Sequence, residues 1–213
     1  MLKAVHLIIL YSLSLTTYSQ KFSVSNEANN TAYVHLPNPI KIAVERYSCN
    51  SLLITTDNGR IEGNKCTYTF YPENIGAAKI IIKSRINGKV KKIGEYVFRI
   101  LDLPLPYLKI GPFSGGTAKR AVFANQQFVR TEDSNPACYD VCNFQIDSFN
   151  IQITNNKNVV FEHTNIGNKL DDSVVNAFHN LLDKDIVFIT KIMVTGGDGK
   201  QRQIYPVQFT IFE

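Results

Sequence analysis

The sequence predicts a mainly β protein made of two tandem immunoglobulin-like or β-sandwich domains, the second of which carries one packed α-helix. Three observations support this fold class. Short stretches of alternating apolar and polar residues recur at intervals of about ten residues in the first half, as in antiparallel sandwiches. A proline-rich segment at residues 103–106 divides the chain. Of the 213 residues, 44% are hydrophobic and 19% are charged, which is enough apolar material for packed cores.

The N-terminus has the pattern of a secretory signal peptide, which we expect to comprise residues 1–19. Lys3 supplies a positive charge, residues 4–15 are mostly apolar, and Thr17 and Ser19 are small residues just before the expected cut. The apolar run is about 12 residues long, whereas a membrane-spanning helix needs about 20. We therefore expect an exported protein whose mature chain has no membrane span.

Residues 20–102 are expected to form the first sandwich, with six or seven short strands. The clearest runs of alternating or β-branched residues are residues 32–36, 40–44, 51–56, 66–70, 79–86 and 90–100. Two pairs, Asn58-Gly59 and Asn87-Gly88, predict tight β-hairpins, because both central residues of such a turn need a positive φ. We expect the strands to form an antiparallel sandwich.

Residues 103–106 alternate leucine and proline and predict a stiff, extended linker, because proline blocks helix formation. Residues 107–213 are expected to form a β-rich second domain with one helix at residues 171–182, where apolar residues recur at helical spacing. Strands are predicted at residues 142–153, 159–161, 185–195 and 203–212. In the first of these, simple alternation places Phe144, Ile146, Ser148 and Asn150 on one face, and Gln145, Asp147, Phe149 and Ile151 on the other.

The four cysteines all lie in the expected mature chain, and export favours disulfides over a zinc site or a catalytic thiol. Three pairings are open. We favour Cys49 with Cys66 and Cys138 with Cys142, because each pair falls within one domain. The second pair needs a turn, because a straight strand would separate its Cα atoms by about 13 Å, beyond the limit of about 7 Å for a disulfide.

Positive charge gathers in the first domain. Residues 20–106 hold 12 Lys and Arg against seven Asp and Glu, whereas residues 107–213 hold ten against 11. The excess lies on a basic hairpin that contains Lys79, Lys83, Arg85, Lys89, Lys91 and Lys92. Alternation puts Lys79, Lys83 and Arg85 on one face, and Ile80, Ile82 and Ile86 on the other. The basic hairpin indicates either an anionic partner or lysines that protect a strand edge from pairing. Export and the lack of interleaved exposed aromatic residues disfavour nucleic acid as that partner.

The sequence contains no catalytic motif. The histidines of the mature chain, His35, His163 and His179, have no nucleophile motif around them, and G-x-S-x-G is absent. The adjacent acids Glu132-Asp133 and Asp171-Asp172 point apart on a strand or a helix, so neither makes an acid–base pair. No P-loop, calcium-loop or zinc-ligand spacing occurs. We therefore expect no enzyme activity, no metal and no cofactor.

Several segments, in their order along the chain, resemble the third and fourth periplasmic domains of the GldM family, called PorM in some relatives. The first half contributes residues 38–44 (NPIKIAV), 56–63 (TDNGRIEG), 72–76 (PENIG) and 87–99 (NGKVKKIGEYVFR), and the linker and second half contribute residues 103–106 (LPLP) and 115–121 (GGTAKRA). The resemblance covers residues 30–213 and is most specific in the first domain and the linker.

The GldM family belongs to the gliding-motility and type IX secretion machinery of Bacteroidetes. The resemblance implies a non-enzymatic exported interaction module, an accessory or truncated paralogue of the periplasmic part of GldM. It implies partners in the cell envelope, such as a ring of the GldK and GldN type, and it leaves a homodimer open. GldM begins with a membrane-spanning helix, a helical domain and a further β domain, and we expect this chain to lack all three.

The periplasm is the expected location, and an extracellular or cell-surface location is the open alternative. The alternative function is a secreted adhesin, or a surface- or glycan-binding module that uses the same two domains. For the GldM-like function the mechanism would be docking by exposed β surface, and the candidate contacts are the basic hairpin and the loop at residues 111–120, which includes Lys119 and Arg120.

Overall fold

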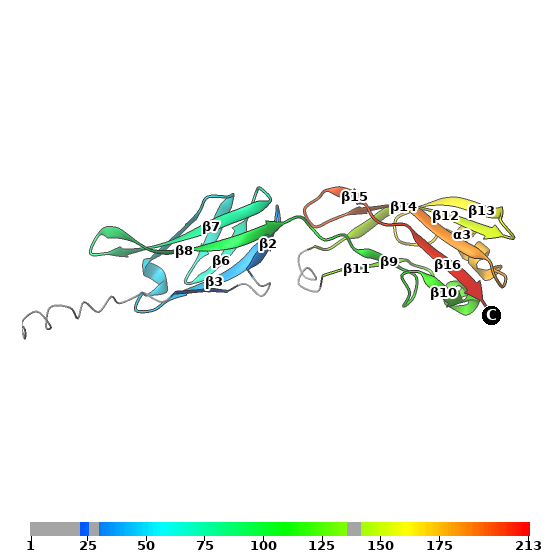
Figure 1. The fold of residues 1–213 in the computed structure, drawn as a ribbon, viewed down its shortest axis with the longest axis horizontal. Coiled ribbons are helices and arrows are strands. Elements are labelled where there is room, and N and C mark those ends of the chain that lie inside the picture. Colours follow the sequence, from blue (N-terminus) through cyan, green and yellow to red (C-terminus); the bar gives the residue numbers. More distant parts are fainter. Residues whose placement is uncertain (1–21, 26–29, 136–141) are drawn as a thin grey trace, which may run out of the picture.

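The computed structural model of the chain describes residues 22–25, 30–135 and 142–213. Two β domains lie end to end in an elongated molecule, and one extended segment joins them (Figure 1). The mainly β fold class and its tandem arrangement are confirmed. The expected signal peptide at residues 1–19 lies outside the described residues. Within the described residues, no helix is long and apolar enough to cross a membrane.

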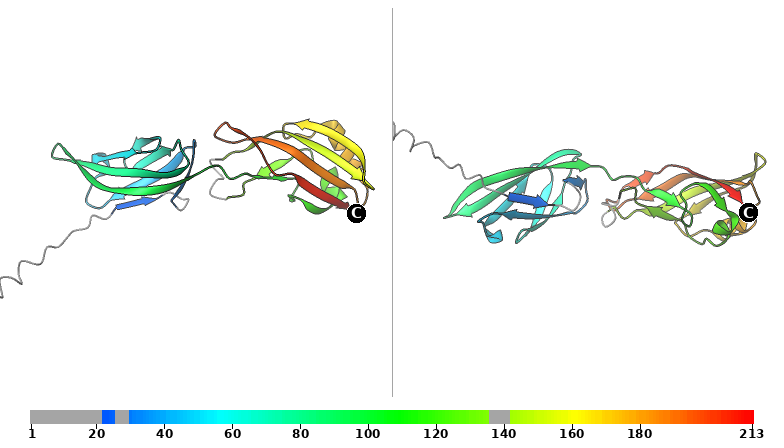
Figure 2. Two further views of the ribbon diagram at one scale, coloured as in Figure 1. Left: turned by 45° about the horizontal axis from the view of Figure 1, so that its top comes forward. Right: turned by 60° about the horizontal axis from the view of Figure 1, so that its bottom comes forward.

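The first domain is a sandwich of two four-stranded sheets (Figure 2). One sheet has the order β1-β3-β6-β5, formed by Phe22–Ser25, Asn38–Val44, Thr67–Tyr71 and Arg60–Asn64. The other has the order β2-β8-β7-β4, formed by Thr31–Tyr33, Lys89–Leu101, Gly76–Ile86 and Leu52–Thr56. The described residues thus form eight strands where the sequence predicted six or seven. The two strands that were not predicted, β1 and β5, have few buried residues to mark them.

Strict alternation builds the core of the first domain. Every second residue of β3 is buried, so Ile40, Ile42 and Val44 point inward. They share a hydrophobic cluster with Phe70 and Phe98, whose ring centroids are 6.0 Å apart. Because burying one such side chain stabilises a fold by about 1.5–3 kcal/mol, these inner faces hold the two sheets together.

One strand pairing differs in direction from the sequence prediction. β2 runs parallel to β8, with Ala32 opposite Ile100, so the sandwich is not purely antiparallel. The alternation of apolar and polar residues shows which face of a strand is buried. It carries no information on whether the neighbouring strand runs parallel or antiparallel. The sequence pattern therefore could not reveal this pairing.

The turn at Asn58-Gly59 is not a β-hairpin, so that prediction is wrong. Its flanking strands β4 and β5 belong to different sheets, and the turn crosses between the two layers. Gly59 has a positive φ of 79°, and a Cβ there would lie 2.1 Å from the Tyr71 carbonyl oxygen. The Asn58 side chain fastens the crossing by donating to the Asn74 carbonyl and accepting from the Glu73 and Asn74 amides.

The second Asn-Gly pair forms the predicted hairpin. Asn87 and Gly88 both have a positive φ, of 48° and 77°, and they join the long antiparallel strands β7 and β8. The hairpin extends beyond the rest of the sandwich (Figure 1). Ile86 shares a face with the buried Ile80 and Ile82 but is 38% exposed, because no facing sheet covers this part of the hairpin.

A disulfide joins Cys49 and Cys66, whose Cα atoms are 5.0 Å apart. Cys49 opens a short 3₁₀-helix, Cys49–Ser51, just before β4, and Cys66 lies just before β6 in the facing sheet. The bond therefore ties the two sheets together. Cys138 lies outside the described residues, so its pairing with the buried Cys142 stays a prediction.

The second domain is built around one sheet with the order β10-β16-β14-β12-β13, and β15 pairs with β14. These strands are β10 Gly116–Lys119, β12 Gln145–Asn155, β13 Asn158–Ile166, β14 Ile186–Thr195, β15 Gln201–Gln203 and β16 Val207–Phe212. A separate two-stranded sheet pairs β9, Tyr107–Lys109, with β11, Arg130–Glu132. β10 runs parallel to β16, and the other pairings of this domain are antiparallel.

Two helices, α2 Arg120–Ala124 and α3 Asp172–His179, pack on the core of the second domain. Phe123 of α2 packs edge-to-face on Phe178 of α3 and on Phe209 of β16, with ring centroids 5.0 and 5.2 Å apart. The helix predicted at residues 171–182 is present but ends at His179. The sequence did not predict α2, because five residues are too few to show a helical repeat.

Irregular pairing changes which residues of β12 are buried. Its register with β14 shifts between Ile146 and Ser148 and again between Ser148 and Asn150. Ile146 is buried before the shifts, and Phe149 and Ile151 are buried after them. The sequence prediction, which placed Ile146, Ser148 and Asn150 on one face, is wrong beyond Ile146, because a β-bulge inserts one residue and reverses the alternation.

We expect the Cys49–Cys66 disulfide to contribute about 3 kcal/mol to stability, because it restricts a loop of 17 residues in the unfolded chain. The variant Cys49→Ser/Cys66→Ser should unfold at a lower urea concentration and keep its far-UV circular dichroism spectrum. Dithiothreitol should lower the midpoint of this transition further in the wild type than in the double variant, which keeps Cys138 and Cys142. Equal midpoints for the two oxidised proteins would contradict the prediction.

Candidate functional site

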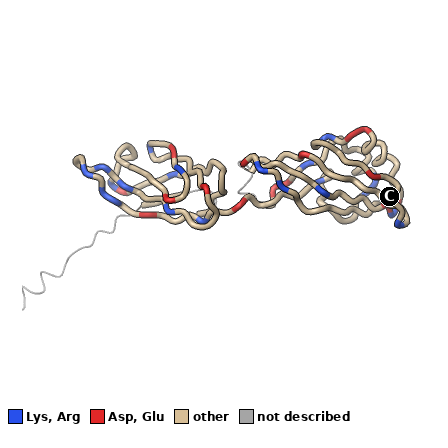
Figure 3. The backbone as a smooth tube through the Cα atoms, turned by 90° about the horizontal axis from the view of Figure 1, so that it is seen from above, with Lys and Arg blue, Asp and Glu red and all other residues tan. Residues whose placement is uncertain are grey.

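The register of β7 and β8 divides the basic hairpin between two faces, because residues paired across antiparallel strands project on the same side. Lys79, Lys83, Arg85 and Lys92 share the outer face, and Lys89 and Lys91 share the opposite face with Ser84 and Ile86. Figure 3 shows the basic residues along the projecting hairpin. The six residues that the sequence grouped together therefore form two separate basic patches.

Lys83 and Arg85 supply unpaired charge to the outer face, and Lys79 likewise forms no ion pair among the described residues. Lys92 is engaged, because its Nζ donates a hydrogen bond of 2.7 Å to Oε2 of Glu95. This bond and the Lys92 charge hold the pKa of the Glu95 carboxyl below its usual range, and Lys79 adds to the effect.

Among the described residues, neither Lys83 nor Arg85 has an ion-pair partner. Two exposed apolar side chains, Val90 and Val97, project on the same face. We call Lys83, Arg85, Val90 and Val97 the outer patch.

The other two predicted contact residues lie far from the basic hairpin. Lys119 ends β10, and Arg120 begins α2. Both elements are at the opposite end of the molecule (Figure 1). The Lys119 Nζ lies 5.9 Å from the centre of the Phe212 ring. The structure does not bring the two sets of basic residues together, so they cannot form one compact contact surface.

Of the histidines and adjacent acids considered in the sequence analysis, His163 and Asp171 are brought together. Within the described ranges, no group of three or more His, Cys, Asp or Glu side chains is placed to hold a metal ion. His163 Nε2 lies 2.7 Å from Asp171 Oδ2, and the pair links β13 to the start of α3. His35 lies in an exposed turn, and His179 ends α3 on its exposed side.

The junction between the domains is a larger assembly of side chains, which the sequence did not indicate. Tyr33 and Leu36, at the end of the first domain, are buried in one cluster with Leu103 of the linker and the core of the second domain. The Tyr33 hydroxyl also accepts a hydrogen bond of 2.8 Å from the Asn135 side-chain amide. Two residues of the first domain therefore pack into the core of the second, while the rest of the first-domain core forms a separate cluster.

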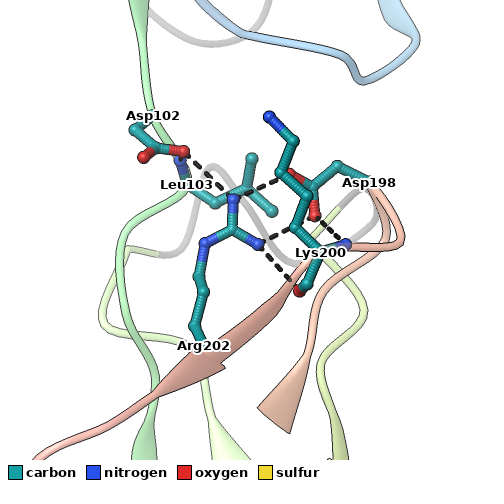
Figure 4. A network of polar contacts seen from close by, with 5 residues as sticks. All are labelled: Asp102, Leu103, Asp198, Lys200 and Arg202. Carbon is teal, nitrogen blue, oxygen red and sulfur yellow. Dashed lines mark hydrogen bonds and ion pairs between the residues drawn. The ribbon is translucent and has the colours of Figure 1, made fainter.

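Arg202 of β15 supplies the polar part of this junction (Figure 4). Its guanidinium donates to both carboxylate oxygens of Asp198, at 2.8 and 2.7 Å, and to the Lys200 carbonyl at 3.1 Å. It also donates to Asp102 Oδ1 at 3.1 Å, and the same oxygen accepts the Leu103 amide at 2.8 Å. One side chain therefore holds a turn of the second domain against the start of the linker.

The Arg202–Asp198 ion pair is shielded from solvent. The Asp198 side chain is completely buried, and the Arg202 side chain is only 13% exposed. The hydrogen bond from Arg202 holds the pKa of the Asp198 carboxyl below its usual range, and Asp198 in turn raises the pKa of the Arg202 guanidinium. A bidentate, charge-assisted pair is strong and geometrically specific. Removing one partner would leave an uncompensated buried charge.

Two further residues permit the close approach of the domains. A Cβ on Gly196 would lie 3.1 Å from the Leu103 side chain, so a larger residue there would press on the linker. Asn38, which is buried, holds the first-domain loop: its Nδ2 donates to the carbonyls of Tyr33 and Leu36 at 2.9 and 2.8 Å, and its Oδ1 accepts the Tyr33 amide. These hydrogen bonds, all within the first domain, hold the loop that enters the junction.

Comparison with known protein families identifies both domains. Residues 21–101 match the GldM third domain, and residues 115–212 match the GldM C-terminal domain. The chain belongs to the GldM family. The resemblance inferred from the sequence is thereby confirmed. GldM-family domains indicate an interaction module related to gliding motility and type IX secretion, with protein partners in the cell envelope, and the disulfide fits an exported protein.

Other comparisons add little to the GldM assignment. No curated protein matches the chain. Among solved structures, the crystal structure of domains 4 and 5 of the S-layer protein SbsC is similar over 91% of this chain and 98% of that chain, with 10% identity and a TM-score of 0.30. Similarity at this level says nothing about what a GldM-family chain binds.

We expect Arg202→Ala to destabilise the second domain by roughly 3 kcal/mol, because it leaves the buried Asp198 carboxylate unpaired. Arg202→Lys should cost less, since an ammonium keeps the charge but not the bidentate fork. Urea unfolding measures the loss, and small-angle X-ray scattering should show a wider range of domain orientations. The matched control is Lys191→Ala, an exposed position on the neighbouring strand β14. A wild-type scattering profile for Arg202→Ala would contradict the role of this pair in the junction.

Proposed function

We propose that this chain is a non-enzymatic, exported protein-interaction module. It would act as an accessory to, or a paralogue of, the periplasmic part of GldM in type IX secretion and gliding motility. The observation that carries the proposal is the tandem match of both GldM domains, at residues 21–101 and 115–212. The Cys49–Cys66 disulfide supports export, because disulfides persist in oxidising compartments, and the proposed location is the periplasm.

The proposed mechanism is docking of exposed β surface onto envelope proteins, by family resemblance a ring of the GldK and GldN type. The outer patch combines Lys83 and Arg85 with the exposed Val90 and Val97. Protein interfaces usually have apolar contacts at the centre and charged residues around them. The charged residues increase the rate at which the two partners associate. The outer patch therefore has the composition of a docking surface.

The opposite face of the hairpin has a simpler explanation. β2 pairs with β8 only from Arg99 to Leu101, so the pairing does not reach the earlier part of this edge. Lys89 and Lys91 lie along that part of the edge. Charged residues on an open strand edge oppose unwanted pairing with other chains. We therefore assign docking to the outer patch and edge protection to Lys89 and Lys91.

The junction gives this module a fixed length. Because Arg202, Asp102 and Leu103 hold the linker against the second domain, a partner bound at the hairpin would keep the second domain at a set distance. A scaffold of this kind presents two ends to different components of an assembly. This supports a structural role in the cell envelope.

The proposal predicts co-purification with the secretion apparatus. The tagged full chain, crosslinked in native cell envelopes and analysed by mass spectrometry, should enrich GldK- and GldN-type proteins over an unrelated exported protein with the same tag. Recovery of intact, abundant protein without these partners would contradict the proposal and favour the adhesin or glycan-binding alternative. Crosslinked species of twice the chain mass would show a homodimer.

Charge reversal tests the outer patch. Lys83→Glu/Arg85→Glu should weaken binding to the captured partner on the order of tenfold and make the remaining affinity less sensitive to salt. Lys89→Glu/Lys91→Glu changes the net charge equally on the opposite face and should have a smaller effect. Equal losses for the two variants would show a response to net charge alone, and unchanged binding at low salt would remove the basic hairpin from the docking surface.

A further inference from the structure

We propose that the second domain binds a lysine side chain from an extended segment of a partner protein. The site is a cavity of about 430 Å³ between the β12–β13 hairpin and the end of α3. Its apolar wall includes Val160, Phe161, Leu181 and Leu182, and its polar residues include Asn155, Asn180 and Asp185. This cavity belongs to neither the outer patch nor the junction.

A buried carboxylate without a cation is the central observation. Asp185 is 3% exposed and, among the described residues that line the cavity, it alone is ionisable. No Lys, Arg or His within the described ranges forms an ion pair with it. Its Oδ1 accepts from Asn155 Nδ2 at 2.6 Å, and its Oδ2 accepts from the Leu182 amide at 2.8 Å. An ionised carboxylate has about four acceptor positions, so these two hydrogen bonds leave capacity for a cation.

The neighbouring amides also offer acceptors rather than donors. Asn155 Nδ2 is committed to Asp185, and Asn180 Nδ2 donates to the Asn176 carbonyl at 2.9 Å. In the described part of the chain, no donor reaches the side-chain oxygen of Asn155 or Asn180 within hydrogen-bond distance. An ammonium group carries three donors and no acceptor. It therefore matches a cavity that combines one carboxylate with two amide oxygens.

The apolar wall suits the rest of a lysine side chain. Val160 and Leu182 are exposed at the cavity, whereas Leu181 and Asp185 are buried. A lysine has four methylene groups that pack against apolar surface while the ammonium reaches a polar partner. In this cavity the methylene groups would lie along Val160 and Leu182, and the ammonium would reach Asp185.

The strand beside the cavity indicates an extended partner segment. β13 is the last strand of its sheet order, so its outer edge has no neighbouring strand among the described residues. Val159 and Val160 are exposed on β13, and Val160 also lines the cavity. An extended peptide can add to such an edge through main-chain hydrogen bonds, while a side-chain pocket gives specificity. The occupant to which the structure points is therefore a partner strand that bears one lysine.

This inference does not depend on the proposed role in secretion. β13 and α3 lie in the domain away from the hairpin (Figure 1). The outer patch and the lysine cavity therefore bind different partners or different parts of one partner. The test below uses synthetic peptides and no envelope component, so it can fail while the capture experiment succeeds, and the reverse.

The test is a titration of the full chain with two capped heptapeptides of alternating threonine and valine, one with a central lysine and one with a central norleucine. At low salt, we expect the lysine peptide to bind at least tenfold more tightly by isothermal titration calorimetry. Amide signals of β13 and of residues 180–185 should shift in nuclear magnetic resonance spectra. Asp185→Asn should reduce the affinity for the lysine peptide to that for the norleucine peptide.

A second variant covers the case in which Asp185→Asn does not fold. Val160→Lys changes an exposed residue and places a tethered ammonium at the cavity, so it should weaken lysine-peptide binding at least tenfold and retain the wild-type fold. Val159→Lys is the matched control, because it adds the same charge one residue away. Equal affinity for the two peptides, no binding at millimolar concentration, or equal effects of the two lysine variants would overturn the proposal.

Discussion

The buried pair between Arg202 and Asp198 is the interaction on which the arrangement of this molecule depends. A carboxylate that is completely buried destabilises the fold unless a cation and donors satisfy it, and Arg202 does so with both of its terminal nitrogens. The same guanidinium reaches Asp102, which begins the linker. The planar fork fixes the guanidinium on Asp198, so one nitrogen is also placed for the exposed Asp102, and the buried Leu103 adds apolar contact beside it. Tyr33 and Leu36 can then stay buried against the second domain.

A fixed junction gives the two ends of the molecule separate roles. The outer patch is basic and apolar, and it projects from the first domain on a hairpin that the sandwich does not cover. The cavity beside β13 contains a carboxylate and lies in the second domain. One end is suited to an anionic surface, and the other is suited to a cationic side chain. This division is consistent with a GldM-family module that connects components of an assembly.

Local sequence patterns predicted the features that depend on local geometry. The alternation of Ile40, Ile42 and Val44 matches their burial, because side chains on a strand alternate between its faces. Asn87-Gly88 forms its hairpin because the turn needs two residues with positive φ. The same two rules gave wrong results at Asn58-Gly59, where tertiary contacts carry the chain into the other sheet, and in β12, where a bulge reverses the alternation. In both cases a long-range pairing overrode a local preference.

The amino-acid order was enough to predict a tandem β protein, the hairpin at Asn87-Gly88 and the family, because each of these is expressed in residues that are close together in the chain. The junction and the cavity were decided by folding. Asp102 and Arg202 are 100 residues apart, and Asn155 and Asp185 are 30 apart. A periodicity or a short motif carries no information on contacts at that separation. Whether an aspartate is a solvated surface charge or a buried partner therefore became known only when the strands and turns around it were in place.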